Sequence, residues 1–174
     1  MVEEMMNNND RLIRLRYALD IKENDMIEMF KLGGIQVTKE EVKKMLVNPD
    51  KFEEDEEVDP DSYIIVDNTV LISFLNGLIT FKRGKKDSGK NDSLKAEEPL
   101  KNSLSINNEM LKKVKIALSL TSDDLLDIFY DVDVDISKSE LSALLRKEGH
   151  RNYKVCLDRY ARNFLKGLAL HFRD

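Results

Sequence analysis

The chain has 174 residues and a formal net charge of −5, with 41% hydrophobic and 35% charged residues. This composition is typical of a water-soluble protein rich in amphipathic helices, and no apolar run approaches the roughly 20 residues of a membrane span. The acidic first residues lack the apolar core of a signal peptide. A single cysteine excludes an intramolecular disulfide and any cysteine-based structural zinc site. We therefore expect a cytoplasmic protein without a membrane segment.

An internal repeat organises the sequence. Residues 8–46 align with residues 107–145 at a constant offset of 99. The identities under this offset are Asn8/Asn107, Asn9/Asn108, Leu12/Leu111, Ala18/Ala117, Leu19/Leu118, Asp25/Asp124, Phe30/Phe129, Lys39/Lys138, Glu41/Glu140 and Leu46/Leu145. Residues 73–78 then align with residues 163–168 at an offset of 90, so nine extra residues fall in the acidic segment 48–62 of the first copy. Surface loops tolerate such insertions because closure entropy rises slowly with loop length.

The duplication predicts an all-α protein with two tandem homologous four-helix units, packed with approximate twofold pseudo-symmetry. The first unit covers residues 1–84 and includes the acidic segment 48–62. The second unit covers residues 106–174. Residues 85–105 are rich in Lys, Ser, Asn and Asp, which predicts a flexible linker between the units.

The first two helices of each unit are predicted from apolar residues at helical spacing. On the first helix these residues are Leu12, Leu15, Ala18 and Leu19, repeated as Leu111, Val114, Ala117 and Leu118. We expect this helix to begin at Asn8-Asn9 and at Asn107-Asn108, because asparagine is a good N-cap residue. The second helix is predicted near residues 24–32 and 122–130, with Ser122 as its N-cap in the second copy.

The third helix opens with the same start signal in both copies, Thr38-x-x-Glu41 and Ser137-x-x-Glu140, which is the pattern of a capping box. The fourth helix is predicted near residues 67–83 and 153–172. It contains a glycine in both copies, at Gly77 and Gly167, and each costs roughly 1 kcal/mol relative to alanine. A destabilising glycine at the same position of both copies indicates that another helix or backbone segment passes close by and leaves no room for a side chain.

Several motifs of the repeat resemble one known family. They are Asn-Asn-x-x-Leu at the start of each unit, Ala-Leu in the first helix, and Phe-Leu-Asn-Gly-Leu at 74–78 followed by Lys82-Arg83-Gly84. These motifs look like the bacterial YehS-like family, and the resemblance covers nearly the whole chain. It implies a short helical domain that occurs twice in a cytoplasmic protein. The family carries no established activity to transfer.

Two segments imitate ligand-binding loops. Residues 84–91 have the two glycines and the lysine of a phosphate-binding P-loop, but Asn91 replaces the hydroxyl that binds Mg²⁺, and a helix rather than a strand precedes the segment. Residues 131–135 imitate the opening of a calcium-binding EF-hand loop. That loop needs glycine at its sixth position and glutamate at its twelfth, where this chain has Ile136 and Ser142. We predict no metal and no cofactor.

Cys156 carries the one thiol of the chain and is therefore the candidate cysteine nucleophile. A Cys–His pair with His150 or His171 remains an alternative, because catalytic partners need not be adjacent in sequence. No activating pattern supports it, and a lone cysteine is more often a small apolar residue in or beside a core. We therefore predict that the protein is not an enzyme.

The basic residues give the one candidate binding surface. Residues 146–173 carry eight Lys and Arg against two acidic residues. The candidate surface consists of Arg146, Lys147, Arg151, Lys154, Arg159, Arg162 and Lys166. Secondary basic positions on the first helices are Arg14, Arg16, Lys113 and Lys115. Such cations either bind phosphate backbones or a protein partner, or form a solvated helix face that pairs with the abundant acidic residues.

The leading hypothesis for function is a non-enzymatic protein-interaction module that binds a protein partner or itself. It rests on the duplicated apolar helix faces and on the lack of a catalytic motif. The alternative is nucleic-acid binding through the basic C-terminal helix and the loop before it. The sequence does not indicate a small-molecule ligand.

Overall fold

The structure is a computed structural model that describes residues 5–84 and 102–173, and its regular elements in these ranges are all helical. The first unit contains α1 (Asn8–Leu19), α2 (Glu23–Leu32), α3 (Lys39–Met45) and α4 (Asn68–Arg83). The second contains α6 (Ile106–Ala117), α7 (Ser122–Tyr130), α8 (Lys138–Leu145) and α9 (Asp158–Arg173). Short 3-10 helices occur at Pro49–Lys51, Pro60–Ser62 and Ser103–Ser105. The predicted all-α fold with two four-helix units is confirmed; residues 85–101 of the predicted linker lie outside the described ranges.

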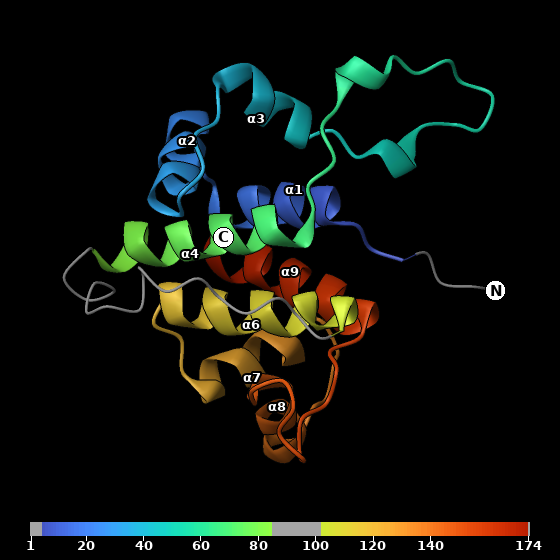
Figure 1. Ribbon diagram of the computed structural model, residues 1–174. Helices are drawn as coiled ribbons and strands as arrows, with labels where there is room; N and C mark the ends of the chain where they lie inside the picture. Colours follow the sequence, from blue (N-terminus) through green and yellow to red (C-terminus); the bar gives the residue numbers. More distant parts are fainter. Residues whose placement is uncertain (1–4, 85–101, 174) are drawn as a thin grey trace.

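The two units pack through their first and fourth helices (Figure 1). Helix α4 of the first unit lies against α6 of the second, and α1 of the first unit lies against α9 of the second. Because α1 corresponds to α6 and α4 corresponds to α9, these two seams are one contact made twice around an approximate twofold axis. Helices α2 and α3 lie on one side of this central layer, and α7 and α8 lie on the other.

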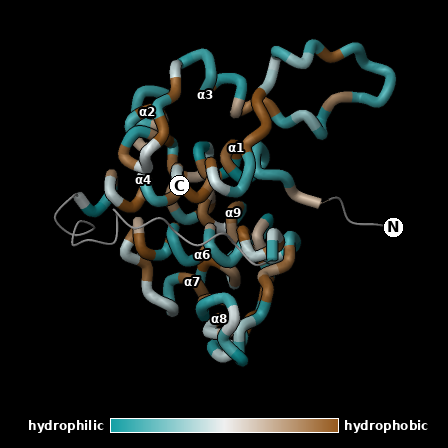
Figure 2. Tube along the Cα trace, in the orientation of Figure 1, coloured by the Kyte–Doolittle hydropathy of each residue, from teal (hydrophilic) through white to brown (hydrophobic). Residues whose placement is uncertain are grey.

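A continuous apolar core runs through both units, and hydrophobic stretches alternate with hydrophilic ones along the helices in Figure 2. An equivalent pair of phenylalanine rings packs together inside each unit. The ring centroids of Phe30 and Phe74 are 5.0 Å apart, and those of the equivalent Phe129 and Phe164 are 5.9 Å apart. All four rings are fully buried, and burying one such side chain stabilises a fold by roughly 1.5–3 kcal/mol.

The last residue of each fourth helix stabilises the end of the other unit's first helix. Arg173 Nη1 donates to the carbonyl oxygen of Tyr17 at 2.9 Å. Arg83 Nη1 donates to the carbonyl oxygen of Ile116 at 3.2 Å. Each guanidinium therefore places a positive charge at the negative end of a helix dipole. The units are joined reciprocally at their edges as well as along their seams.

Asn9 and Asn108 have a different role from the N-cap predicted for them. Helix α1 is capped by Asn7, whose side chain accepts the N–H of Asp10, and Asn9 lies buried in the first turn. Its amide nitrogen donates to the carbonyl oxygens of Met45, Val47 and Ile64, and its oxygen accepts the N–H of Val66. Asn108 makes the equivalent bonds to Leu144, Lys154 and Cys156.

The start of α9 and the N-cap of α7 also differ from the sequence prediction. Helix α9 begins at Asp158 and not near Tyr153, and Asn108 binds backbone groups of Lys154 and Cys156 in the non-helical segment before it. The N-cap of α7 is Thr121 and not Ser122, and Thr121 forms a full capping box with Asp124. The capping box of Thr38 and Glu41 is confirmed. The second predicted box is only half formed: Ser137 accepts the N–H of Glu140, but the Glu140 carboxylate accepts from the Ser137 hydroxyl rather than from its backbone N–H.

The two glycines of the fourth helices lie where another helix passes, as predicted. A methyl group on Gly77 would overlap the carbonyl oxygen of Met29 in α2. A methyl group on Gly167 would lie 2.5 Å from the carbonyl oxygen of Ile128 in α7.

Within residues 5–84 and 102–173, no helix combines the length and apolarity required to cross a membrane.

Candidate functional site

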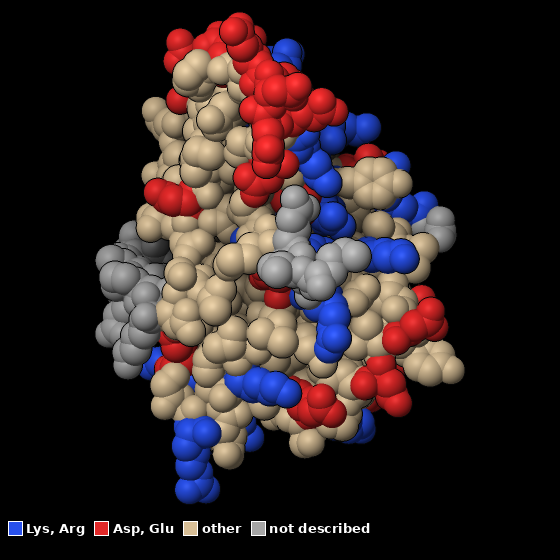
Figure 3. Space-filling view, turned by 90° about the vertical axis from the view of Figure 1, so that its right-hand side faces the viewer, with Lys and Arg blue, Asp and Glu red and all other residues tan. Residues whose placement is uncertain are grey.

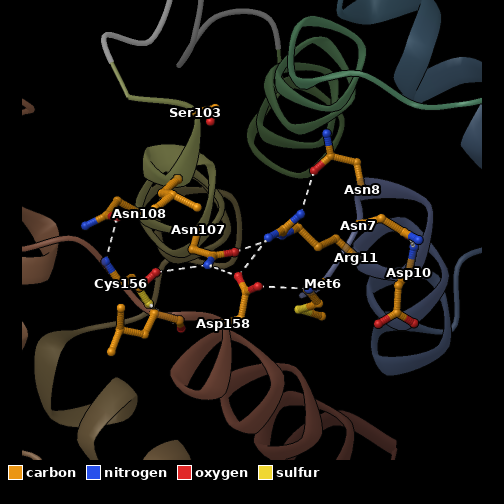
Figure 4. Close-up of polar contacts among 12 residues, drawn as sticks. Met6, Asn7, Asn8, Asp10, Arg11, Ser103, Asn107, Asn108, Cys156 and Asp158 are labelled. Atoms are coloured by element: carbon orange, nitrogen blue, oxygen red, sulfur yellow. Dashed lines mark hydrogen bonds and ion pairs between the residues drawn. The ribbon is translucent and has the colours of Figure 1, made fainter. Parts of the chain in front are cut away.

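A buried polar cluster joins the two units where the first turns of the central helices meet (Figure 4). Asn8 donates to Asn68 Oδ1 at 2.8 Å, and the equivalent Asn107 donates to Asp158 Oδ1 at 2.8 Å. The repeat thus builds the same hydrogen bond twice, with an amide acceptor in the first unit and a carboxylate in the second.

Arg11 connects these two hydrogen bonds across the pseudo-twofold axis. It is 4% exposed, and Nε and Nη1 donate to Asn107 and Asn8 at 2.8 Å each. Nη2 forms an ion pair with Asp158 at 3.1 Å. Burial lowers the pKa of Arg11, while the charge of Asp158 opposes that shift. All three nitrogens of the guanidinium bind groups of the cluster, so the cluster acts as a joint between the units.

Cys156 lies beside this cluster and behaves as the small apolar residue that we predicted. It is 2% exposed, and burial raises the pKa of its thiol to about 12. A nucleophilic cysteine requires the thiolate, which this environment disfavours. Within the described chain, the thiol contacts the carbonyl oxygen of Leu157, while His150 accepts the N–H of Asn152 and His171 packs against Phe172. The structure therefore gives the Cys–His alternative no geometric support.

The segments that imitate ligand-binding loops take ordinary structural positions. Asp133 has a φ of 63° in the turn after α7, and the three aspartates at 131, 133 and 135 are exposed. Among the described residues, no group of three or more His, Cys, Asp or Glu is placed to hold a metal ion. Most of the P-loop-like segment, residues 85–91, lies outside the described ranges.

The structure divides the predicted basic surface into two groups. Arg146, Lys147, Arg151 and Lys154 lie at the end of α8 and in the loop after it, near one tip of the molecule (Figure 1). Arg159, Arg162 and Lys166 lie on one face of α9 by their spacing. Arg14 of α1 lies beside Arg162 and Lys166 across the seam, whereas Arg159 lines a separate hollow beside Cys156. The first group lines no part of the α1–α9 seam.

The remaining secondary positions do not extend either group. Lys113 is 9% exposed and lies in the α4–α6 seam, where its Nζ donates to Asn76 at 2.8 Å. Arg16 is exposed and Lys115 is half-buried, and neither lines the α1–α9 seam.

The α1–α9 seam contains an open groove of about 420 Å³. The residues that line this α1–α9 groove are Ile13, Arg14, Tyr17, Arg162, Asn163, Leu165, Lys166 and Ala169. Its accessible apolar residues are Ile13, Tyr17 and Ala169, and Leu165, which also lines it, is buried. The Tyr17 ring is held by Arg173, whose guanidinium lies 4.2 Å from the ring centroid. Cationic side chains around an apolar hollow favour a ligand that is both apolar and acidic.

Sequence reasoning located the cations of this groove but missed its apolar residues. A signal was present in the alignment of the two copies. Ala169 stands where the first copy has Ile79, so less apolar volume fills the seam at that position. The buried cluster of Arg11 and Asp158 was also missed, because their contact joins residues 147 positions apart.

Sequence comparison assigns the chain to a family. A family model described as "Protein of unknown function (DUF1456)" matches residues 8–84 and 107–174. The chain belongs to the DUF1456 family. It is also similar to "Uncharacterized protein YehS" of Escherichia coli (strain K12), with 37% identity over 164 residues, which are 94% of this chain and 95% of the relative. No solved structure matches the chain.

The DUF1456 match confirms the resemblance to the YehS-like family that the repeated motifs indicated. Its two matched segments coincide with the two helical units, so one DUF1456 domain corresponds to one set of four helices. The groove and the polar cluster both lie between the two domains. Both features therefore depend on the duplication and are absent from an isolated domain.

Proposed function

We propose that this DUF1456 protein is a non-enzymatic, cytoplasmic protein-interaction module whose α1–α9 groove binds an acidic segment with an apolar side chain. The partner is another protein or a second copy of the chain. The observation that carries the proposal is the apolar groove of about 420 Å³ with Arg14, Arg162 and Lys166 around it. An apolar side chain that enters such a hollow supplies affinity, and the surrounding charges supply specificity.

The pseudo-symmetry supplies a matched experiment. Ala169→Ile places in the groove the side chain that the first copy has at the equivalent position, and Ile79→Ala makes the reverse change in the α4–α6 seam. Immobilised wild-type protein and both variants are compared for the partners that they retain from native lysate, with and without nuclease. We expect Ala169→Ile to lose a nuclease-resistant partner that the wild type and Ile79→Ala retain. Equal retention by all three proteins would exclude the groove as the docking site.

Nucleic-acid binding is the second candidate, favoured by the alignment of Arg159, Arg162 and Lys166 on one face of α9. Contacts to phosphate backbones weaken steeply with salt and depend on charge. A salt titration with DNA and RNA tests this candidate. Absence of binding at about 50 mM salt, where phosphate contacts are strong, would eliminate it. If binding occurs, Lys166→Glu is expected to weaken it, whereas Ala169→Ile leaves it unchanged.

A further inference from the structure

The acidic loop of the first unit carries charge that the described residues do not neutralise. Residues 53–61 contain seven carboxylates and no Lys or Arg. All seven acidic residues are exposed, and none forms an ion pair with a cation of the described ranges. The loop extends beyond the helical body in Figure 1. Within it, Val58 is a half-buried apolar residue between carboxylates.

The base of this loop is fixed beside the α1–α9 groove. Asn7, the N-cap of α1, donates to Asn48 Oδ1 and Asp50 Oδ2 at 2.7 Å each. Asn48, Asp50 and Lys51 line a small hollow of about 50 Å³, and Arg14 and Arg162 line both this hollow and the groove. Figure 3 shows acidic residues gathered at one end of this face and Lys and Arg side chains below them. The acidic loop and the basic groove are therefore neighbours on one face.

We propose that the occupant of the groove is the acidic loop of a second copy of this chain, so that the protein forms a reciprocal dimer. This inference rests on the proposed function and names the partner for the same site. Val58 of one copy enters the groove of the other, and the carboxylates of residues 53–57 meet Arg14, Arg159, Arg162 and Lys166.

The arrangement of loop and groove suits twofold symmetry. In a twofold dimer each surface patch meets its own counterpart, so a self-complementary face is required. Here one face carries both a positive groove and a negative loop, and a single twofold axis brings each loop to the other copy's groove. A projecting loop reaches a second molecule more readily than it reaches the seam beside its own base. Opposite charges across the contact raise the association rate and fix the register.

The test uses full-length protein and two charge-reversed variants in sedimentation velocity. The loop variant carries Glu53→Lys, Glu54→Lys, Glu56→Lys and Glu57→Lys, and the groove variant carries Arg159→Glu, Arg162→Glu and Lys166→Glu. We expect wild-type protein to dimerise at low salt and to dissociate at about 1 M salt, where the screening length falls to about 3 Å. Each variant alone is expected to dimerise about tenfold or more weakly. A mixture of the two variants is expected to recover dimers, because each loop then faces a groove of opposite charge.

The control variant carries Lys147→Glu, Arg151→Glu and Lys154→Glu, which reverse three exposed cations at the tip beside α8. It has the same change of net charge as the groove variant, and we expect its dimerisation to equal that of the wild type. Arg162 is half-buried, so circular dichroism must show that the groove variant is folded; the loop variant changes exposed residues only and tests the proposal independently.

The outcomes separate this inference from the proposed function. A wild-type protein that is monomeric at low salt overturns the dimer, as does dimerisation that is unchanged in the loop variant. In either case the proposed function stands if Ala169→Ile loses a captured protein partner that Ile79→Ala retains. Loss of dimers in both charge variants, with recovery in their mixture, supports the acidic loop as the occupant.

Discussion

The two seams between the units are built from equivalent helices, but the α4–α6 seam is closed by packed side chains and the α1–α9 seam contains an open groove. In the α4–α6 seam, Lys113 is buried and donates to Asn76. At the equivalent positions of the α1–α9 seam stand Arg14 and Lys166, two cations that repel each other. Arg14 pairs instead with Asp10 of its own helix at 2.9 Å. The duplicated scaffold thus keeps the α4–α6 seam closed and leaves the α1–α9 seam open, and the two seams differ at these equivalent positions.

The largest expected effect on stability concerns the buried polar cluster between the units, where Arg11 of the first unit corresponds to Met110 of the second. Arg11→Met gives the first unit the residue of the second and leaves Asp158 without its buried cation. Breaking a buried ion pair from one side costs about 3–5 kcal/mol. We therefore expect the free energy of unfolding, measured with urea, to fall by that amount.

The second half of this test adds Asp158→Asn, which gives the second unit the amide that Asn68 supplies in the first. The double variant removes the unpaired charge and keeps an acceptor for Asn107, so we expect it to recover more than half of the loss. A cost below about 1 kcal/mol for Arg11→Met, the range of exposed ion pairs, would contradict the role of Arg11 as a joint.

The next comparison is between the two helix crossings inside the units. In the first unit both Gly33 and Gly77 lie at the crossing of α2 and α4, whereas in the second unit Val132 replaces the first of these glycines. Gly77→Ala would place a methyl group on the backbone of α2, and we expect a loss of about 3 kcal/mol, at the upper end of overpacking costs. Gly167→Ala meets the side chain of Ile128 as well as its backbone.

Because the added methyl group approaches the neighbouring backbone less closely at Gly167 than at Gly77, Gly167→Ala is expected to cost about 1–2 kcal/mol. Thermal unfolding of both variants measures the difference. Equal losses would show that both crossings accommodate a methyl group equally well. That result would contradict the closer approach of α2 to α4 than of α7 to α9.

A smaller effect distinguishes the seams themselves. Ile79→Ala removes apolar contact from the closed α4–α6 seam, and we expect a loss of about 1–2 kcal/mol for this half-buried side chain. Ala169→Ile adds a side chain to the open groove, and we expect a change within about 1 kcal/mol, because open space receives the added atoms. Urea unfolding measures both. A large loss for Ala169→Ile would mean that the α1–α9 seam is already closely packed.

The repeat allowed the fold to be predicted because apolar periodicity and capping signals are local properties of the sequence. The capping box at Thr38 and the glycines of the fourth helices were readable for this reason. Asn9 and Asn108 were misassigned because asparagine is equally suited to a cap and to a buried bridge. The choice depends on whether distant backbone groups need partners, and local sequence does not contain that information.

The candidate site was less accessible to prediction. Its cations were visible as a charged helix face, but charge alone joined Arg146 and Lys166 into one surface that the fold divides. The groove itself arises from a difference between equivalent positions, Ala169 and Ile79, which becomes meaningful only when the packing of α1 on α9 is known. Comparing the copies position by position in the assembled fold is therefore more informative than reading either copy alone.

The smallest expected effect concerns Cys156, which occupies the position of Val66 in the first unit; both residues are buried. Burial raises the pKa of the thiol from 9.0 to about 12, so the unfolded chain releases this proton at lower pH than the folded chain does. The resulting stabilisation is complete below pH 9 and is lost as the pH rises towards 12. Cys156→Val conserves apolar character and gives both units the same residue. At pH 10, about 1 kcal/mol of the alkaline loss should disappear in the variant.

Urea unfolding of wild type and Cys156→Val at pH 7 and pH 10 isolates this contribution, because the two proteins differ only at residue 156. The substitution conserves volume, so its cost at pH 7 should stay below about 1.5 kcal/mol. The native thiol should also react slowly with alkylating reagents and rapidly in urea. Parallel pH profiles, together with fast alkylation of the native protein, would show that the thiol is in contact with solvent. The polar cluster beside Cys156 would then be open in solution, unlike the surroundings of the equivalent Val66.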